Sequence, residues 1–330
     1  MIRSMQTTAP KFSAAQQQML DLAAAAKPQV AAKLLLELAA TFWKTGQVAE
    51  CVECFARSYR KEPCSKLKDI LGPQADPAQV RRLTLTMIEY GCRYSDVIGE
   101  LAAAEAALGH PDAVRRLVDY GRFYREGSCE PPPGTSLETF NRAVAEEVKA
   151  HLTFYPRADT AIRNTWRNNR AMRAETPALA ALHSILARQV EHYIAALPAD
   201  QDHPFIASLP PEHDLGGWAV VSTPEGHHAP HTHPGSWANG VYYVSQPDIS
   251  RGAQDRRGWL KVGPPPEFAD HDAAVSGWET RFIEPKAGSF VLFPSYFFHS
   301  TEPMRVDQER VCIAFEIQPK EIGHVGPRIY

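Results

Sequence analysis

The sequence lacks a long uninterrupted apolar run, the mark of a membrane span or a secretory leader. Residues 1–6 do not form the apolar core of a signal peptide. Lys27, Lys33 and Glu37 interrupt the most apolar tract, 23–43. We therefore predict a cytoplasmic protein with no membrane partner.

Cysteine is scarce. Six cysteines in 330 residues are too few for a disulfide-stapled scaffold and fit a reducing compartment. Cys51 and Cys54 form a CxxC pair, but no second pair follows at the spacing of a zinc ribbon. Because the pair lies in a helical pattern, we interpret it as two small apolar residues on one helix face.

An excess of one charge sign is also missing. The 35 Lys and Arg nearly balance the 38 Asp and Glu, for a formal charge of −3, which argues against a nucleic-acid partner. The chain holds no P-loop, no dinucleotide fingerprint and no HExxH, so nucleotide hydrolysis, hydride transfer and zincin proteolysis have no motif support. Hydrophobic residues at 44% and charged residues at 22% are typical of a globular protein, and the length suggests about two domains.

The first third is rich in alanine and leucine and has helical periodicity. The segment 32–65 resembles a tetratricopeptide repeat in the positions of Leu35, Leu38, Ala39, Gly46, Phe55 and Pro63. It departs from that pattern at Cys51 and Ser58, where alanine is usual. A second helical hairpin is expected around Gly109, but its distance from Gly46 is not a multiple of the repeat of about 34 residues. An ordinary helical domain and a peptide-binding solenoid both stay open.

Prolines divide the chain. Three consecutive prolines within 130–136 cannot continue a helix, so this segment is the predicted linker. Helices are expected over 137–152 and 175–197. From about 203, short β-branched and aromatic runs separated by turn residues predict strands. These runs are 218–221, 240–244, 259–262, 289–293 and 311–315.

The predicted fold class is therefore α+β. A helical, tetratricopeptide-like domain over 1–129 precedes a linker at 130–136. The C-terminal domain, 137–330, begins with flanking helices over 137–197. An antiparallel sandwich or jelly roll follows from about 203.

Histidines gather in this β-rich region. His231 and His233 are two residues apart, so on an extended chain both imidazoles point to one side. His299 lies far along the chain, just after the strand expected at 289–293. Two nearby ligands and one distant ligand are the usual layout of a jelly-roll metal site. Imidazole suits Fe(II), Zn, Cu and Ni alike, so the ligand type alone does not select the metal.

The segment 231–244, HTHPGSWANGVYYV, resembles the metal-binding segment of the Fe(II)/2-oxoglutarate oxygenases. The downstream segment 285–295, PKAGSFVLFPS, followed by His299 and Arg310, resembles the same family. The resemblance covers roughly 137–330, including Trp218, and it departs at Asn239, where the family typically has a small residue. It implies a double-stranded β-helix that uses Fe(II), 2-oxoglutarate and O2.

The resemblance also assigns roles. His231 and His299 become metal ligands, and Arg310 becomes the residue that binds the C5 carboxylate of 2-oxoglutarate. Its guanidinium can donate two parallel hydrogen bonds to a carboxylate. Tyr243 matches a tyrosine that helps to hold this carboxylate in related prolyl hydroxylases. A second set of residues, expected to contact the substrate or the metal ligands, comprises His228, Trp237 and Asn239.

His233 stands where many relatives have Asp or Glu, and three outcomes are open. It could bind the metal and complete a three-histidine site. It could remain unbound to the metal, which would then have two protein ligands and an additional water. A remote carboxylate, such as Asp214 or Glu225, could take its place. We favour ligation by His233.

The predicted function is that of an Fe(II)/2-oxoglutarate-dependent dioxygenase that hydroxylates an amino-acid, peptide or protein side chain and releases succinate and CO2. One alternative is a three-histidine cupin dioxygenase that does not use 2-oxoglutarate. Another is an interaction protein whose helical N-terminal domain binds a protein partner while the oxygenase domain is inactive.

Overall fold

The computed structural model describes residues 10–63, 67–72, 74–157, 161–247 and 255–322. The N-terminal residues 1–6, considered above, and Cys64, one of the six cysteines, lie outside these ranges. Within them, no helix is long and apolar enough to cross a bilayer.

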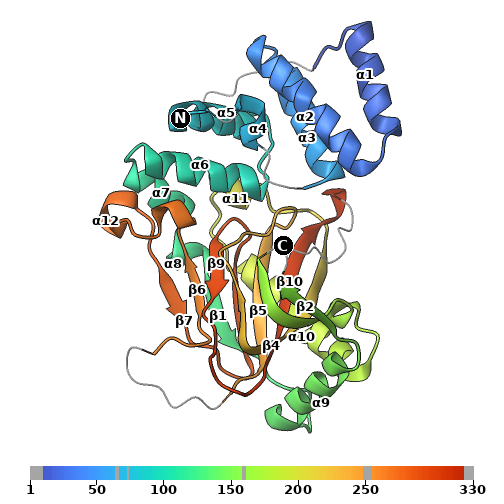
Figure 1. Cartoon of the computed structure of the whole chain (residues 1–330), viewed down its shortest axis with the longest axis vertical. Coiled ribbons are helices and arrows are strands. Elements are labelled where there is room, and N and C mark those ends of the chain that lie inside the picture. The colour runs from blue at the N-terminus through green and yellow to red at the C-terminus, as the bar shows by residue number, and fades with distance from the viewer. Residues whose placement is uncertain (1–9, 64–66, 73, 158–160, 248–254, 323–330) are drawn as a thin grey trace.

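Helices dominate the first part of the chain and flank the strands in the second (Figure 1). The helices are α1 (Ala14–Ala25), α2 (Pro28–Lys44), α3 (Val48–Lys61), α4 (Leu67–Leu71), α5 (Pro77–Glu89), α6 (Ser95–Ala107), α7 (Pro111–Leu117), α8 (Tyr120–Phe123), α9 (Leu137–Lys149), α10 (Pro177–Ala195), α11 (Pro204–Ala207) and α12 (Ala273–Ser276). Short 3₁₀ turns cover Ala171–Arg173, Pro266–Phe268 and Lys320–Ile322.

The strands form two antiparallel sheets. They are β1 (Arg125–Ser128), β2 (Thr153–Arg157), β3 (Ile162–Asn168), β4 (His213–His228), β5 (Ala238–Ser245), β6 (Leu260–Gly263), β7 (Arg281–Ile283), β8 (Ser289–Pro294), β9 (Phe298–Thr301) and β10 (Arg310–Pro319). The large sheet has the order β1-β8-β5-β10-β4-β3-β2, and the small sheet has the order β7-β6-β9. The five strands expected from the sequence are all present, as β4, β5, β6, β8 and β10.

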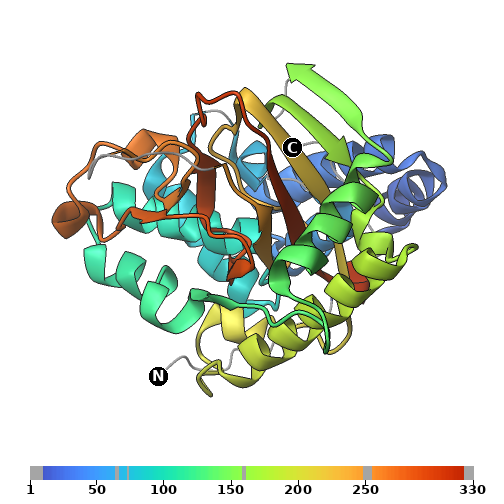
Figure 2. The ribbon, with the colours of Figure 1, turned by 90° about the horizontal axis from the view of Figure 1, so that it is seen from below.

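The alternation of side chains along β10 gives the large sheet two different faces. Val311, Ile313 and Phe315 belong to the main apolar core, where the helices α9 and α10 also bury their apolar sides. Arg310 and Cys312 point to the opposite, inner face, because successive strand residues alternate. Figure 2 shows α9 and α10 on one side of the large sheet and the small sheet on the other. The inner face therefore encloses a space between the two sheets.

Local sequence explains where the flanking helices begin. Ser136 caps α9 by accepting a hydrogen bond from the Thr139 N–H at 3.1 Å. At α10, Pro177 occupies the first turn, and the Glu147 carboxylate accepts from the Ala178 and Leu179 N–H groups. The helices predicted over 137–152 and 175–197 are confirmed, with slightly shorter bounds.

The helical region has an apolar core of its own. Buried residues from Leu20 to Val97 form one cluster, and residues from Ile98 onward join the core of the sheets. The helices α2 and α3 form the expected hairpin, and Gly46 adopts a positive φ of 75° at its turn. The apolar cores thus divide within α6, and β1, which precedes the predicted linker, pairs with β8.

Both cysteines of the CxxC pair are buried in this helical core as free thiols. Burial raises the pKa of the Cys51 and Cys54 thiols to about 12. Their place in the apolar core confirms the interpretation of the pair as packing residues.

Candidate functional site

Three imidazoles converge between the two sheets. His299 lies on β9, and His231 pairs with it through two reciprocal backbone hydrogen bonds of 3.0 Å. His233 follows, and its N–H donates to the Ser295 carbonyl at 3.1 Å. One ring nitrogen from each of the three histidines lies within 4.8 Å of the others, the spacing of a metal site.

The hydrogen bonds of the other ring nitrogens determine which nitrogen faces the centre. In each ring Nδ1 meets an oxygen that only accepts: the Ala229 carbonyl at 2.8 Å from His231, and the Phe297 carbonyl at 3.1 Å from His299. For His233 this oxygen is Oε1 of Glu316, at 2.6 Å. Nδ1 must therefore carry the hydrogen, and Nε2 of each neutral ring keeps its lone pair.

The ring nitrogens that face the centre of the cluster are therefore the Nε2 atoms. The Nε2 atoms of His233 and His299 are 3.0 Å apart. Burial lowers the pKa of His231 to about 3 and also holds the pKa of His299 well below its usual range, so these rings are neutral at physiological pH. Imidazole nitrogens gathered at this spacing suit a divalent cation.

A buried cation lies in the same cavity. Arg310, at the first position of β10, is 2% exposed. Its Nη1 donates to the Gly258 carbonyl at 2.6 Å, and its Nη2 donates to Oγ of Ser222 at 3.2 Å. Among the described residues, Nε of Arg310 has no hydrogen-bond partner and no carboxylate pairs with the guanidinium. Since a buried charge requires a partner, this donor fits the carboxylate of a ligand.

Three more of the predicted site residues line the cavity: His228, Asn239 and Tyr243. The His228 ring centroid lies 5.7 Å from that of His231, and burial lowers the pKa of His228 well below its usual range. The Asn239 Oδ1 is buried and has no hydrogen-bond partner among the described residues. Burial raises the pKa of Tyr243, which remains a neutral phenol.

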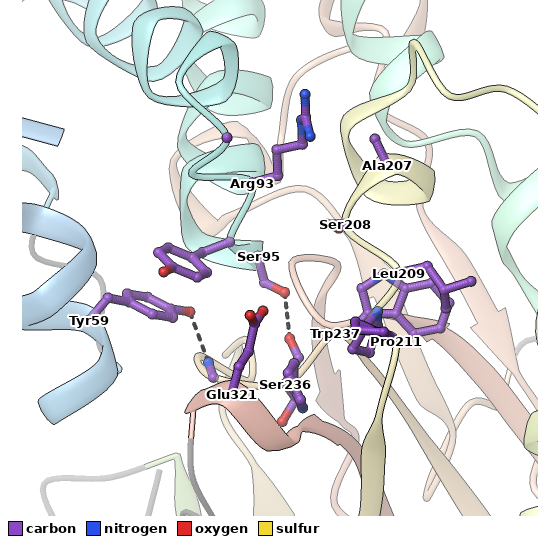
Figure 3. A pocket seen from close by; sticks show the side chains of 15 residues that line it. Tyr59, Arg93, Ser95, Ala207, Ser208, Leu209, Pro211, Ser236, Trp237 and Glu321 are labelled. Atoms are coloured by element: carbon purple, nitrogen blue, oxygen red, sulfur yellow. Dashed lines mark hydrogen bonds between the residues drawn. The ribbon is translucent and has the colours of Figure 1, made fainter. Parts of the chain in front are cut away.

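Trp237 does not line this cavity. Its indole stacks on Phe205 with ring centroids 4.5 Å apart, and its Nε1 donates to the Phe205 carbonyl at 3.0 Å. It borders a different cavity, between the helical region and the sheets, as Figure 3 shows. Trp237 therefore packs in the main apolar core, whereas His233 belongs to the histidine cluster.

The carboxylate beside His233 was missed by the sequence reasoning. Asp214 and Glu225, the two candidates considered, are exposed and outside the histidine cluster. Glu316 is the carboxylate in contact. A signal for it existed: Glu316 follows Arg310 by an even number of residues, so both side chains share the inner face of β10 once that strand extends past 315.

The loop behind His233 rests on the helical region. The N–H of Gly235 donates to the Tyr59 hydroxyl at 2.9 Å, and the Ser95 hydroxyl donates to the Ser236 carbonyl at 2.5 Å. Figure 3 shows both contacts, with Tyr59 on α3 and Ser95 at the start of α6. The helical region therefore supports the segment that carries two of the three histidines.

Comparison with known proteins identifies the matched segment. Residues 216–316 match the family model described as "Putative 2OG-Fe(II) oxygenase". None of the curated proteins matches the chain significantly.

Several solved structures match part of the chain. A prolyl-4-hydroxylase from Pseudomonas putida is 17% identical, with a TM-score of 0.40 over 61% of this chain and 95% of that chain. A prolyl hydroxylase from Trichoplax adhaerens, in complex with a peptide fragment of a hypoxia inducible factor, is 14% identical, with a TM-score of 0.42 over 61% and 86%. HygX from Streptomyces hygroscopicus, with nickel, 2-oxoglutarate and hygromycin B bound, is 15% identical, with a TM-score of 0.38 over 61% and 85%.

The matched segment contains His231, His233, His299 and Arg310, the side chains that converge in the cavity. A site of three nitrogen donors beside a buried guanidinium suits a metal ion with an anionic cosubstrate. The segment 216–316 thus matches a family of 2OG-Fe(II) oxygenases, and its converging side chains suit the cofactor and cosubstrate of that family, Fe(II) and 2-oxoglutarate.

Proposed function

We propose that the chain is a dioxygenase dependent on Fe(II) and 2-oxoglutarate that hydroxylates an amino-acid, peptide or protein side chain. The observation that carries this proposal is the convergence of three Nε2 lone pairs from His231, His233 and His299. Fe(II) with bound 2-oxoglutarate would supply the oxidation of a C–H bond by O2, with release of succinate and CO2. We also propose that the two sheets form the double-stranded β-helix of this enzyme class.

The protein's own residues would bind, orient and exclude water. The three imidazoles would hold the metal on one side and leave its other positions open. Arg310, with Tyr243 beside it, would bind the distal carboxylate of 2-oxoglutarate. The apolar walls, which include Trp218, Val220 and Leu260, would keep water from the reaction. His228 and Asn239 are the polar groups left to contact the substrate.

The direct test is anaerobic addition of Fe(II) and 2-oxoglutarate to the purified chain. We expect the charge-transfer absorption of the Fe(II)–2-oxoglutarate chelate, and we expect His299→Ala to abolish it. His227→Ala is the matched control, since His227 is a neighbouring histidine outside the cavity. Absence of the band in the intact chain at saturating ligand contradicts the proposal.

Arg310 separates this function from that of a three-histidine dioxygenase that does not use 2-oxoglutarate. Removing a buried charge that pairs with a ligand costs about 2–5 kcal/mol. Arg310→Ala should therefore weaken 2-oxoglutarate binding at least about 30-fold and leave metal binding intact. Metal-dependent turnover that survives in Arg310→Ala, without consumption of 2-oxoglutarate, favours the alternative enzyme.

A further inference from the structure

A buried carboxylate contacts the metal site from behind. Glu316 and His233 have side chains that are 3% and 4% exposed, and their Oε1 and Nδ1 atoms are 2.6 Å apart. The other carboxylate oxygen of Glu316 accepts from Nε2 of Gln318 at 2.6 Å. Both oxygens are therefore held, and Glu316 cannot turn away from the histidine without losing two hydrogen bonds.

This contact determines the orientation of the His233 ring. The ionised carboxylate only accepts, so Nδ1 of His233 must donate and Nε2 must face the other two histidines. Trp218 lies nearly parallel to the ring, with centroids 5.8 Å apart and an interplanar angle of 19°. The hydrogen bond to Glu316 therefore orients the His233 ring, and Trp218 lies against one face of it.

The same contact places a negative charge near the metal. A site of two histidines and a carboxylate gives a divalent ion one negative ligand, whereas three neutral imidazoles give it none. Glu316 is separated from that ion's position by the width of one imidazole. A carboxylate bonded to the far nitrogen of a histidine ligand raises the basicity of the ligand and orients it.

We propose that Glu316 is the positioning residue of the metal site: it holds His233 as the third ligand and supplies, through that ring, the negative charge that a directly bound Asp or Glu would otherwise bring. This inference rests on the proposed function, since it requires that the three histidines bind a metal. The carboxylate that supplies this charge thus lies on β10, and not in the segment 231–233 that carries two of the histidines.

Binding of Mn(II) alone, followed by the electron paramagnetic resonance signal of the free ion, tests the proposal without turnover. Loss of a carboxylate behind a metal-bound histidine typically weakens metal binding about 10–100-fold, and we expect this range for Glu316→Gln. The matched control is Glu105→Gln. Glu105 is also buried, and it also pairs with a histidine, His110, at 2.6 Å, but it lies in α6 with Arg81 as its second partner. Its Mn(II) affinity should equal that of the unchanged chain.

A double-mutant cycle separates positioning from a general structural effect. In a His233→Ala background, Glu316→Gln should have no further effect on the Mn(II) dissociation constant, because the ring through which it acts is gone. An equal effect in both backgrounds, or an unchanged dissociation constant in Glu316→Gln itself, overturns the proposal.

Two further outcomes are distinguishable. If the unchanged chain binds no Mn(II), the proposed metal site fails, and with it the role of Glu316. If Glu316→Gln does not fold, Glu316→Asp keeps the charge but shortens the side chain by one methylene. We expect it too to weaken Mn(II) binding, and an unchanged affinity in that variant refutes the assignment.

Discussion

At the scale of residues, the choice of ring nitrogen separates the three clustered histidines, the proposed metal ligands, from a structural histidine. His203 is fully buried, and its Nδ1 accepts a hydrogen bond from the Phe205 N–H at 3.2 Å. Its Nε2 donates to the Arg116 carbonyl at 3.0 Å. Both nitrogens of His203 are thus satisfied by the protein, whereas His231, His233 and His299 each bond through Nδ1 and direct Nε2 toward one another.

His203 predicts a pH dependence of stability. Burial lowers the pKa of His203 from 6.5 to about 4. Between pH 6.5 and pH 4, His203 therefore binds a proton in the unfolded chain but not in the folded chain. Its contribution to the free energy of unfolding is therefore complete above 6.5 and is lost as the pH falls toward 4, by about 3 kcal/mol in all. Urea unfolding near neutral pH and at about pH 5 should show a smaller acid loss in His203→Gln than in the unchanged chain. Equal losses in the two proteins contradict this assignment.

At the scale of elements, the central strands carry both the core and the site. On β10, Val311, Ile313 and Phe315 belong to the main apolar core, while Arg310 faces the cavity and Glu316 contacts His233. The hydrophobic residues of the outer face hold the strand in register, because a shift by one residue would exchange the two faces. The precision of the site therefore depends on packing that lies on the other side of the sheet.

The variant Gly240→Ala tests how strongly the protein depends on the close packing of these strands. Gly240 pairs with Phe315 on β10 and Leu292 on β8, and an added Cβ would lie 2.4 Å from the Val291 carbonyl oxygen and 2.5 Å from the Phe315 ring. Because the obstacles are backbone and a buried ring, Gly240→Ala should lower the free energy of unfolding by about 1–3 kcal/mol. Urea unfolding measures this loss. Gly121→Ala is the control, because its Cβ would meet only the end of the Asp119 side chain, at 3.2 Å.

At the scale of the whole molecule, the helical region is joined to the site and not merely adjacent to it. Figure 1 shows α6 lying across the end of the strands. Its residues contribute to both apolar cores, with Val97 in one and Ile98 in the other. The boundary predicted at 129 and the tetratricopeptide-like assignment stay predictions, as does a protein partner for the helical region.

The double variant Tyr59→Phe with Ser95→Ala tests whether the helical region supports the metal-binding loop. It removes the acceptor for the Gly235 N–H and the donor to the Ser236 carbonyl. An unsatisfied buried polar group costs about 1–3 kcal/mol, so we expect a loss of stability of this order for each contact. Mn(II) should also bind more weakly, because the loop follows His233 directly. Unchanged Mn(II) affinity in the folded double variant contradicts a supporting role.

Much of the fold could be predicted because its signals are local. Turn residues bound the strands, and Ser136 and Pro177 lie where two of the expected helices begin. The roles of Trp237 and Glu316 could not be predicted in this way. Trp237 turns into the core because Phe205 offers it a stacking surface, and Glu316 meets His233 across 83 residues of chain. Such contacts depend on which strands become neighbours.

The sequence by itself determined the resemblance to the 2OG-Fe(II) oxygenases, since the order of His231, His233, His299 and Arg310 with their flanking residues needs no coordinates to be read. It also determined the alternation that separates an inner from an outer face on each strand. Only the tertiary structure decided that three Nε2 atoms converge and that a buried carboxylate stands behind His233. The physical reason is that hydrogen-bond partners select the tautomer of each ring, and those partners come from strands brought together by folding.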